Sequence, residues 1–380
     1  MSYPVLYLIF KLYSRLIEKL YTINVENTDI DIMNLKTRSS RNAWFLCYHI
    51  YSTSNQYSPK AVAQFELDLK YAVEKLDVEY VIIEDYFDKL VWGEYANVWS
   101  EETLKAFIKL IHDYGAKFLP YTNATELSIT GQQYPKHGRD WGAKTSWGKI
   151  YAGYASIFYP SVYIFPEYEW YAKIMCAKSG WKDFLLDQIR QLHENYELDG
   201  LYLDRVDYRV PCYDHNKDPK HFEKALPGLV REMQKINKSV SQSNILIVND
   251  SCMQPDYITE EIFGIADGIL SELLLADMNP YGIDQKLAVR FVDLAWKFKW
   301  LVRTILTYLL PVLYHSKLMT NKQRMQNIIK RIRDASGDKD LWLFSHQKDK
   351  ESIEFLTSNI ESENTHLCFC SGVKRLRELH

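Results

Sequence analysis

The chain has 380 residues, of which 47% are hydrophobic and 25% are charged, and its formal net charge is −3 at pH 7. This length allows a large buried core in one or two domains. Basic and acidic residues are interspersed rather than grouped, which argues against a nucleic-acid-binding surface and favours neutral or weakly charged partners.

The first segment, residues 3–21, predicts an amphipathic helix, because lysines and an arginine recur at helical spacing beside leucines. The apolar run 5–10 inside it is too short to span a bilayer. No basic residue precedes this run and no small-residue cleavage site follows it, so we expect no signal peptide and a cytoplasmic location. Residues 1–42 are interpreted as this helix and a polar linker. The helix is expected to dock on a single domain formed by residues 43–380, with peripheral membrane contact as the minority interpretation.

Short apolar runs then alternate with helical patterns along the chain. Strands are predicted at 43–50, 80–83, 117–121, 201–203, 244–248, 268–270, 303–309 and 340–344. Helices are predicted at 59–77, 101–114, 181–196, 222–236, 258–265, 282–299 and 322–335. Eight strands that alternate with helices predict an α/β fold of the (β/α)8 (TIM) barrel type, with an open doubly wound sheet as the alternative.

One long segment, residues 127–180, interrupts this alternation after the third predicted strand. It is rich in aromatic residues, among them Trp141, Trp147 and Trp170. We expect it to be an inserted loop or subdomain at the end of the barrel where the strands finish. Its aromatic rings are suited to covering the faces of sugar rings, and equally suited to packing against one another.

The cysteines and histidines show no metal-binding spacing. Six cysteines occur without a CxxC pair, which favours reduced thiols in a reducing compartment. Cys368 and Cys370 are expected on one face of a strand as small buried residues. His49 is the one histidine expected near a strand end, so we predict neither a metal nor a cofactor. The remaining candidates, His137, His215 and His221, are interpreted as surface residues of loops.

Polar side chains, mostly carboxylates, follow the predicted strands. They are Glu84, Asp85, Tyr121, Asn123, Glu126, Asp204, Asp207, Asn249, Asp250 and Glu272. Asp204 comes directly after the buried run in LDGLYLDRVDY, where a barrel enzyme keeps its chemistry. In the structural alternative, Asp204 caps a helix or pairs with Arg205. Paired carboxylates, without a nucleotide-binding, Schiff-base or nucleophile-elbow motif, indicate glycoside cleavage.

Five of these segments resemble glycoside hydrolase family 114, the endo-α-1,4-polygalactosaminidase-like barrels, and more distantly the α-galactosidase-type barrels. The segments are IIEDY, FLPYTNATEL, DGLYLDRVD, ILIVND and DGILSELLL, in that order on successive strands. The resemblance covers residues 43–311 and implies a glycosidase with Asp204 and Glu272 as its central carboxylates. It implies sugar-binding or supporting roles for Asp85, Tyr121, Asn123 and Glu126.

The third-strand segment departs from the family pattern, which resembles Asn-x-Gly-Glu. Ala124 and Thr125 stand here between the asparagine and Glu126, so we expect Glu126 to be displaced. Three further residues near strand ends are expected to bind substrate, together with the three tryptophans of the insertion. They are Arg205, Asp207 and Asp250.

The expected mechanism assigns different roles to the two central carboxylates. Asp204 stabilises or attacks the anomeric centre, and Glu272, set among leucines that favour its protonated form, donates the proton. Analogy with α-galactosidase-type barrels favours retention. The alternative is a catalytically inactive barrel that binds carbohydrate or acts as a scaffold, with the segments 3–21 and 345–380 as interaction surfaces. The sequence leaves the sugar, the linkage and the oligomeric state open.

Overall fold

Eight parallel strands form a closed barrel in the order β1-β10-β9-β8-β7-β6-β3-β2. The computed structural model describes residues 41–46, 59–84, 86–87, 91–151, 172–206, 210–250, 257–271, 321–344 and 364–370. The barrel strands are β1 (Asn42–Leu46), β2 (Val78–Ile83), β3 (Lys117–Asn123), β6 (Gly200–Asp204), β7 (Ile245–Asp250), β8 (Gly268–Ser271), β9 (Asp340–Phe344) and β10 (Thr365–Cys370). The predicted (β/α)8 barrel is therefore confirmed.

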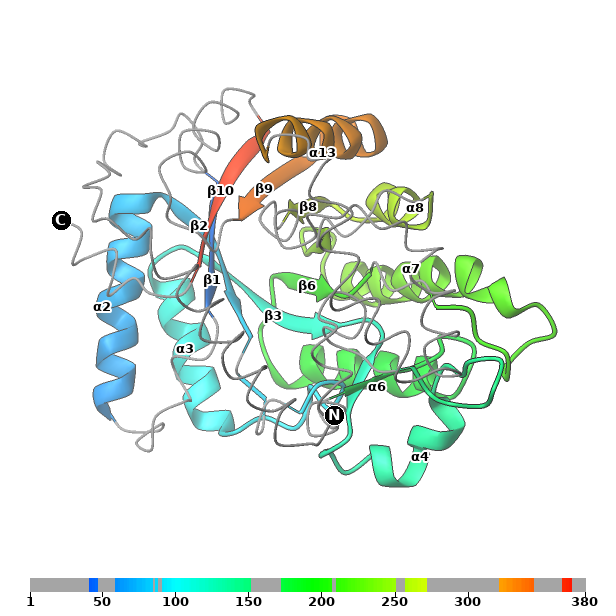
Figure 1. Cartoon of the computed structure of the whole chain (residues 1–380). Coiled ribbons are helices and arrows are strands. Elements are labelled where there is room, and N and C mark those ends of the chain that lie inside the picture. Colours follow the sequence, from blue (N-terminus) through cyan, green and yellow to red (C-terminus); the bar gives the residue numbers. More distant parts are fainter. Residues whose placement is uncertain are drawn as a thin grey trace, which may run out of the picture.

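Helices cover the outside of this barrel (Figure 1). They are α2 (Pro59–Leu76), α3 (Glu101–Asp113), α6 (Trp181–Asn195), α7 (Phe222–Val240), α8 (Tyr257–Ile265) and α13 (Asn321–Ser336). The helix α3 illustrates how the sequence sets their limits. Ser100 caps it by accepting a hydrogen bond of 3.2 Å from the Thr103 N–H, and Gly115, with a φ of 77°, follows its end. The face that carries Leu104, Phe107 and Ile111 is buried against the barrel.

Aromatic rings fill the inside of the barrel. The ring centroid of Phe45 in β1 lies 5.3 Å from that of Tyr202 in β6 and 5.6 Å from that of Phe344 in β9. Because β1 and β6 are not neighbours in the sheet, the contact between Phe45 and Tyr202 must cross the barrel interior. Tyr121 of β3 joins the same cluster, 5.8 Å from Tyr202. These rings form a packed floor below the ends of the strands.

The last two strands of the ring differ from the sequence prediction. The strand β8 pairs directly with β9, and the predicted strand at 303–309 lies outside the described residues. The eighth strand is instead β10, which pairs with β9 and β1 and closes the ring. The sequence missed β10 as a barrel strand because the apolar run 303–309 meets the criteria for a strand as well as THLCFC does. Segment 365–370 is thus part of the barrel and not of an interaction tail, and Cys368 and Cys370 share a strand, as expected.

Several strands are also longer than predicted, β2, β3 and β7 among them. The strand β2 begins at Val78, β3 continues to Asn123, and β7 continues to Asp250. Polar residues that were expected to follow strands are therefore hydrogen-bonded members of them. Their side-chain directions are fixed by the sheet rather than by a loop.

The described part of the insertion adds no strand to the barrel. Its two short strands, β4 (Glu126–Ser128) and β5 (Ala172–Ile174), pair antiparallel as a separate sheet, and α4 (Tyr134–Trp141) lies between them in sequence. It shares a small second core with the loop after β6. The buried members of this second core are Ala143, Tyr151, Ile174, Cys176, Val210 and Cys212.

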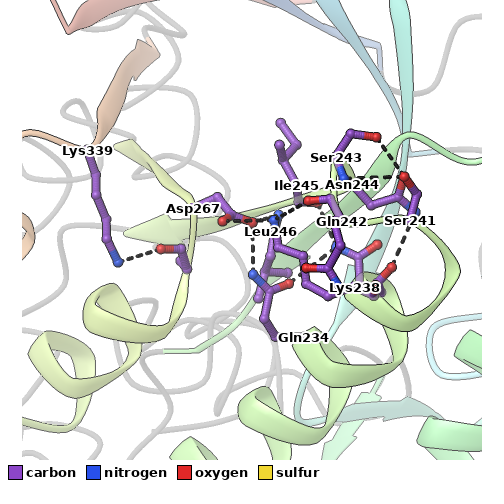
Figure 2. A network of polar contacts seen from close by, with 12 residues as sticks. Gln234, Lys238, Ser241, Gln242, Ser243, Asn244, Ile245, Leu246, Asp267 and Lys339 are labelled. Carbon is purple, nitrogen blue, oxygen red and sulfur yellow. Dashed lines mark hydrogen bonds and ion pairs between the residues drawn. The ribbon is translucent and has the colours of Figure 1, made fainter.

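Polar side chains connect the amino ends of the strands through hydrogen bonds and ion pairs. Asp267, just before β8, accepts hydrogen bonds of 2.8 Å from the Leu246 N–H and from Gln234, and Lys238 lies 3.1 Å from its other oxygen (Figure 2). Lys339 donates to the carbonyl groups at and beyond the end of α8, including that of Phe263 at 2.8 Å. These contacts satisfy backbone groups that the helix and strand ends leave without partners.

A second polar group lies where the ring closes. Arg41 contacts Asp340 at 2.5 Å, Glu79 at 3.2 Å and the Tyr80 hydroxyl at 2.6 Å. His366 lies 2.7 Å from the other carboxylate oxygen of Asp340. The group therefore ties β2, β9 and β10 together at their amino ends.

Some predicted elements cannot be compared with the structure. The helices at 3–21 and 282–299 fall outside the described residues. Among the helices that the structure does describe, none combines the length and the apolar character needed to cross a membrane.

Candidate active site

Asp204 is the last residue of β6 and lies at the carboxyl end of the barrel. Register places it beside Asn123 of β3, and its side chain is 13% exposed. The segment reaches this position because Gly200, with a φ of 156°, opens the strand where a side chain would collide with the Ile245 carbonyl group. Leu201, Tyr202 and Leu203 then bury the strand completely, so that the first partly exposed group is the carboxylate.

Three donors hold the Asp204 carboxylate. The Tyr121 hydroxyl donates to Oδ2 at 2.7 Å. The Asn249 side-chain amide and the Arg205 backbone N–H each donate to Oδ1 at 2.7 Å. Two of these donors are uncharged side chains on the neighbouring strands β3 and β7. The carboxylate is therefore oriented by rigid strands on both sides.

Tyr121 is suited to be a permanent donor. Its side chain is buried, and burial, followed by the negative charges of Asp204 and Glu84, raises the pKa of its hydroxyl well above the ordinary value. The Tyr86 hydroxyl donates to the Tyr121 backbone carbonyl at 3.0 Å and so holds β3 at this point. The pKa of the buried Tyr95, whose ring centroid is 6.5 Å from that of Tyr121, is raised well above its ordinary value as well, chiefly by burial. The tyrosines around Asp204 thus stay protonated at neutral pH.

Arg205 follows Asp204 in a left-handed backbone conformation, with a φ of 56°. This conformation costs a non-glycine residue about 1 kcal/mol. Its Nε atom lies 3.7 Å from Asp204 Oδ2 and 3.7 Å from Glu126 Oε2, so one guanidinium group faces two carboxylates. Strain of this kind is concentrated at functional sites.

Asn123 and Glu126 form a compact turn at the end of β3. The Asn123 side-chain oxygen accepts from the backbone N–H groups of Thr125 and Glu126, and its amide donates to Glu126 Oε2 at 2.8 Å. The Glu126 side chain is fully buried. Thr125, which stands where the family pattern has glycine, is accommodated by this turn. Glu126 is therefore brought beside Arg205 rather than toward solvent.

Asp250, which the sequence placed among the substrate-binding residues, is 1% exposed in its side chain and pairs with Arg331 at 2.7 Å. This ion pair links β7 to α13. Four other predicted site residues lie outside the described residues. They are Asp85, Asp207, Trp170 and Glu272. Ser271, the residue before Glu272, ends β8 in register with Asp250.

The two described tryptophans of the predicted set have different surroundings. Trp141 stacks on His137, with ring centroids 4.4 Å apart, and on Phe184 at 5.1 Å. It therefore packs α4 against α6. Trp147, by contrast, is 42% exposed.

Sequence reasoning named Asn249 as a strand-end residue but assigned it no role, and it did not single out Tyr86 or Tyr95. The parallel order of β6 and β7 would have placed Asn249 next to Asp204. Tyr86 ends the segment IIEDY, which carried the family resemblance, whereas Tyr95 comes from the irregular segment after β2, where spacing predicts nothing.

No family model and no curated protein matches this chain. Solved structures of (β/α)8 enzymes do. An α-amylase from Lactobacillus plantarum has a TM-score of 0.53 at 11% identity, over 89% of this chain and 72% of that chain. A noncanonic maltogenic α-amylase from Thermotoga neapolitana has a TM-score of 0.52 at 11% identity, over 88% of this chain and 68% of that one.

A cycloisomaltooligosaccharide glucanotransferase from a Paenibacillus species, complexed with cycloisomaltoheptaose, has a TM-score of 0.51 at 13% identity over 85% of this chain. This chain spans 40% of the length of that protein. At these identities the likeness is one of fold.

Proposed function

We propose that this chain is a glycoside hydrolase that cleaves an O-glycosidic bond in an oligo- or polysaccharide. The observation that carries the proposal is Asp204, a partly exposed carboxylate at the carboxyl end of a barrel strand, held by Tyr121, Asn249 and the Arg205 N–H. Such pre-organised positioning is what nucleophilic or electrostatic catalysis at an anomeric carbon requires. The names of the matching barrels, α-amylases and a glucanotransferase, support a carbohydrate substrate.

In the proposed mechanism, Asp204 attacks or stabilises the anomeric centre, and Glu272 protonates the leaving oxygen. Glu272 is supported by its place in the sequence directly after β8, because the carboxyl ends of parallel strands meet at one end of a barrel. Tyr121, Asn249 and Arg205 position Asp204, and Asn123 and Glu126 support Arg205. Contacts to the sugar are assigned to Trp147 and to three residues known only from the sequence. The latter are Asp85, Asp207 and Trp170.

The substrate we propose to test first is an α-linked, galactosaminide-like polysaccharide, since the strand motifs resemble the polygalactosaminidase-like barrels. Release of reducing ends from this and other α-linked polymers measures turnover. Asp204→Asn should abolish turnover of polymers and of activated aryl glycosides. Glu272→Gln should retain part of the activity on activated glycosides, whose leaving group needs little protonation.

The matched control for this experiment is Asp187→Asn, a change at an exposed carboxylate of α6 that accepts a hydrogen bond only from the neighbouring Gln191 among the contacts described. It should leave turnover unchanged. Full activity in both active-site variants would remove Asp204 and Glu272 from the mechanism, and the reverse pattern would exchange their roles.

One observation favours the second candidate, a catalytically inactive carbohydrate-binding or scaffold barrel. Both oxygens of Asp204 already accept hydrogen bonds, so the group is partly occupied before a substrate arrives. Calorimetry separates the two candidates. Oligosaccharide binding without release of reducing ends by the wild-type chain would establish the inactive barrel.

A further inference from the structure

Two cysteines and one histidine converge between the insertion and the loop after β6, and a second histidine, His221, lies beside one of the cysteines. The potential ligand atoms of Cys176, Cys212 and His215 all lie within 4.8 Å of one another. His215 Nδ1 is 3.1 Å from Cys212 Sγ, and His221 Nε2 is 3.2 Å from Cys176 Sγ. The sequence had indicated neither a metal site nor a buried histidine here, yet His221 is 6% exposed.

The two sulfur-to-nitrogen distances, one in each cysteine–histidine pair, are close to those of a metal centre. With Zn–S bonds of about 2.3 Å and Zn–N bonds of about 2.0 Å, sulfur and nitrogen ligands of a tetrahedral ion lie about 3.5 Å apart. The sulfur-to-nitrogen distances found here are shorter by a few tenths of an ångström. A small outward movement of the side chains would therefore make room for the ion. Both cysteines are free thiols and not a disulfide.

The outer hydrogen bonds of the two histidines orient the inner nitrogens toward the sulfurs. His215 Nε2 lies 2.6 Å from the Asp140 carbonyl oxygen, and His221 Nδ1 lies 2.7 Å from the Asp218 carbonyl oxygen. A carbonyl oxygen only accepts, so these outer nitrogens carry the hydrogen. His215 Nδ1 and His221 Nε2 are left with lone pairs. Metal-binding histidines are held in this way by backbone carbonyl groups.

The neighbouring backbone adds a feature typical of metal-bound thiolates. The Lys178 N–H points to Cys176 Sγ at 3.5 Å, within a turn closed by the Ser179 N–H and the Cys176 carbonyl group. The other three residues come from one short stretch, CYDHNKDPKH, in which Cys212 and His215 are separated by two residues. Thiolates select soft or borderline ions, and two thiolates with two imidazoles favour Zn²⁺.

The location explains why a metal would be useful. Among the described residues, the second core has six buried members, few to hold a subdomain together by apolar burial alone. Cys176 lies at the end of the insertion, and the partner His221 is 45 positions away on the far side of β6. A bond between them would fasten the insertion to the loop that follows the Asp204 strand.

We propose that Cys176, Cys212, His215 and His221 bind one structural Zn²⁺ that fastens the insertion to the loop after β6. Four protein ligands complete a tetrahedral shell, so the ion keeps no open position for a substrate. The site is separate from the proposed glycosidase chemistry and does not depend on it. Its free energy of binding contributes directly to the stability of this part of the chain.

Metal analysis of the purified full-length chain tests the proposal. Elemental analysis by inductively coupled plasma mass spectrometry should find one zinc ion per chain. Cys212→Ser and His221→Ala should lower the zinc content at least several-fold. Matched controls are Cys368→Ser, at a buried cysteine of β10, and His137→Ala, at a histidine on α4 outside the site. Both controls should keep the full zinc content.

Two measurements on the wild-type chain keep the test valid if the variants fail to fold. A zinc-specific chelator should lower the Tm, and added Zn²⁺ should restore it. Replacing zinc by Co²⁺ should give visible bands of a tetrahedral ion together with a thiolate charge-transfer band. A chain that binds no zinc at micromolar concentration, with a Tm unaffected by chelator, would overturn the proposal. A native disulfide between Cys176 and Cys212 would overturn it as well.

Discussion

The two ends of the barrel use polar residues in opposite ways. At the amino end, opposite charges meet directly, as between Arg41 and Asp340 at 2.5 Å, and side chains such as Asp267 satisfy backbone groups. At the carboxyl end, Asp204 is held mainly by neutral donors, Arg205 Nε lies 3.7 Å from its carboxylate, and the backbone is strained at Arg205. Polar groups at the amino end stabilise the fold, and those around Asp204 position one carboxylate, while the Asp250–Arg331 ion pair at the carboxyl end also joins β7 to a helix. Mutations at the two ends should therefore separate stability from activity.

The largest expected effect on stability is at the amino end. Asp267→Ala leaves the Leu246 N–H, Gln234 and Lys238 without their acceptor and should lower the free energy of unfolding by about 2 kcal/mol. Asp267→Asn keeps an acceptor for the N–H and should lose less. Urea unfolding measures both variants, and turnover per folded molecule should not change. A loss of turnover equal to that of an Asp204 variant would break the comparison between the two ends.

The next effect is on activity at the carboxyl end. Tyr121→Phe removes one of the three donors to Asp204 and should lower kcat about tenfold, the equivalent of about 1.4 kcal/mol, with KM nearly unchanged. Steady-state kinetics on the substrate identified for the wild type provides the measurement. Tyr86→Phe, which removes a hydrogen bond to backbone instead, serves as the matched control and should affect kcat less. Equal effects of the two changes would mean that the Tyr121 hydroxyl does not position the carboxylate.

A smaller effect on stability is expected from the backbone strain at Arg205, which two substitutions can isolate. Both Arg205→Gly and Arg205→Ala remove the guanidinium group, but only glycine adopts a φ of 56° without cost. The glycine variant should be more stable than the alanine variant by about 1 kcal/mol. The difference between their urea midpoints is the measurement. If alanine is the more stable of the two, the left-handed conformation stores no strain.

The smallest effect is a pH dependence at the amino end. Burial opposes ionisation of Asp340, but the His366 hydrogen bond and the Arg41 charge outweigh it and lower the pKa of this carboxyl. A carboxyl with a lowered folded-state pKa stabilises the fold above its unfolded pKa of about 3.9, and the contribution is lost as the pH falls through the folded value. Asp340→Asn should be less stable at pH 7 and should lose less stability between pH 5 and pH 3. Parallel curves for variant and wild type would contradict this role.

The barrel could be predicted from the sequence because the evidence for each strand is local. Apolar runs such as Leu201–Leu203, bounded by turn residues, indicate buried strands one at a time, and their alternation with helices indicates the fold. The prediction of the closing strand failed because the pairing between β10 and β1 is set by residues far apart in the chain. Asp204 was recognisable from its position after a strand. The donor role of Asn249 was not, since it depends on the register of β6 against β7.

The candidate metal centre shows the same limit. Cys212, His215 and His221 lie close together in sequence, but without Cys176 they do not make a set of ligands, and they were interpreted as ordinary loop residues. Cys176 follows β5, whose antiparallel pairing with β4 joins residues far apart in the sequence. Sequence spacing alone could not supply that contact.

The closure of the ring by β10 has a consequence for the growing polypeptide on the ribosome. Asn42 of β1 accepts a hydrogen bond from the Leu367 N–H, and the two residues are 325 positions apart. Until residues 365–370 have been made, β1 has an unpaired edge, and exposed edges invite pairing with other chains. The strands β3, β6 and β7 around Asp204 are translated well before this point. These strands around Asp204 can therefore pair early. The pairing of β10 with β1 can form only after the end of the barrel has been synthesised, and it is the step most exposed to misassembly.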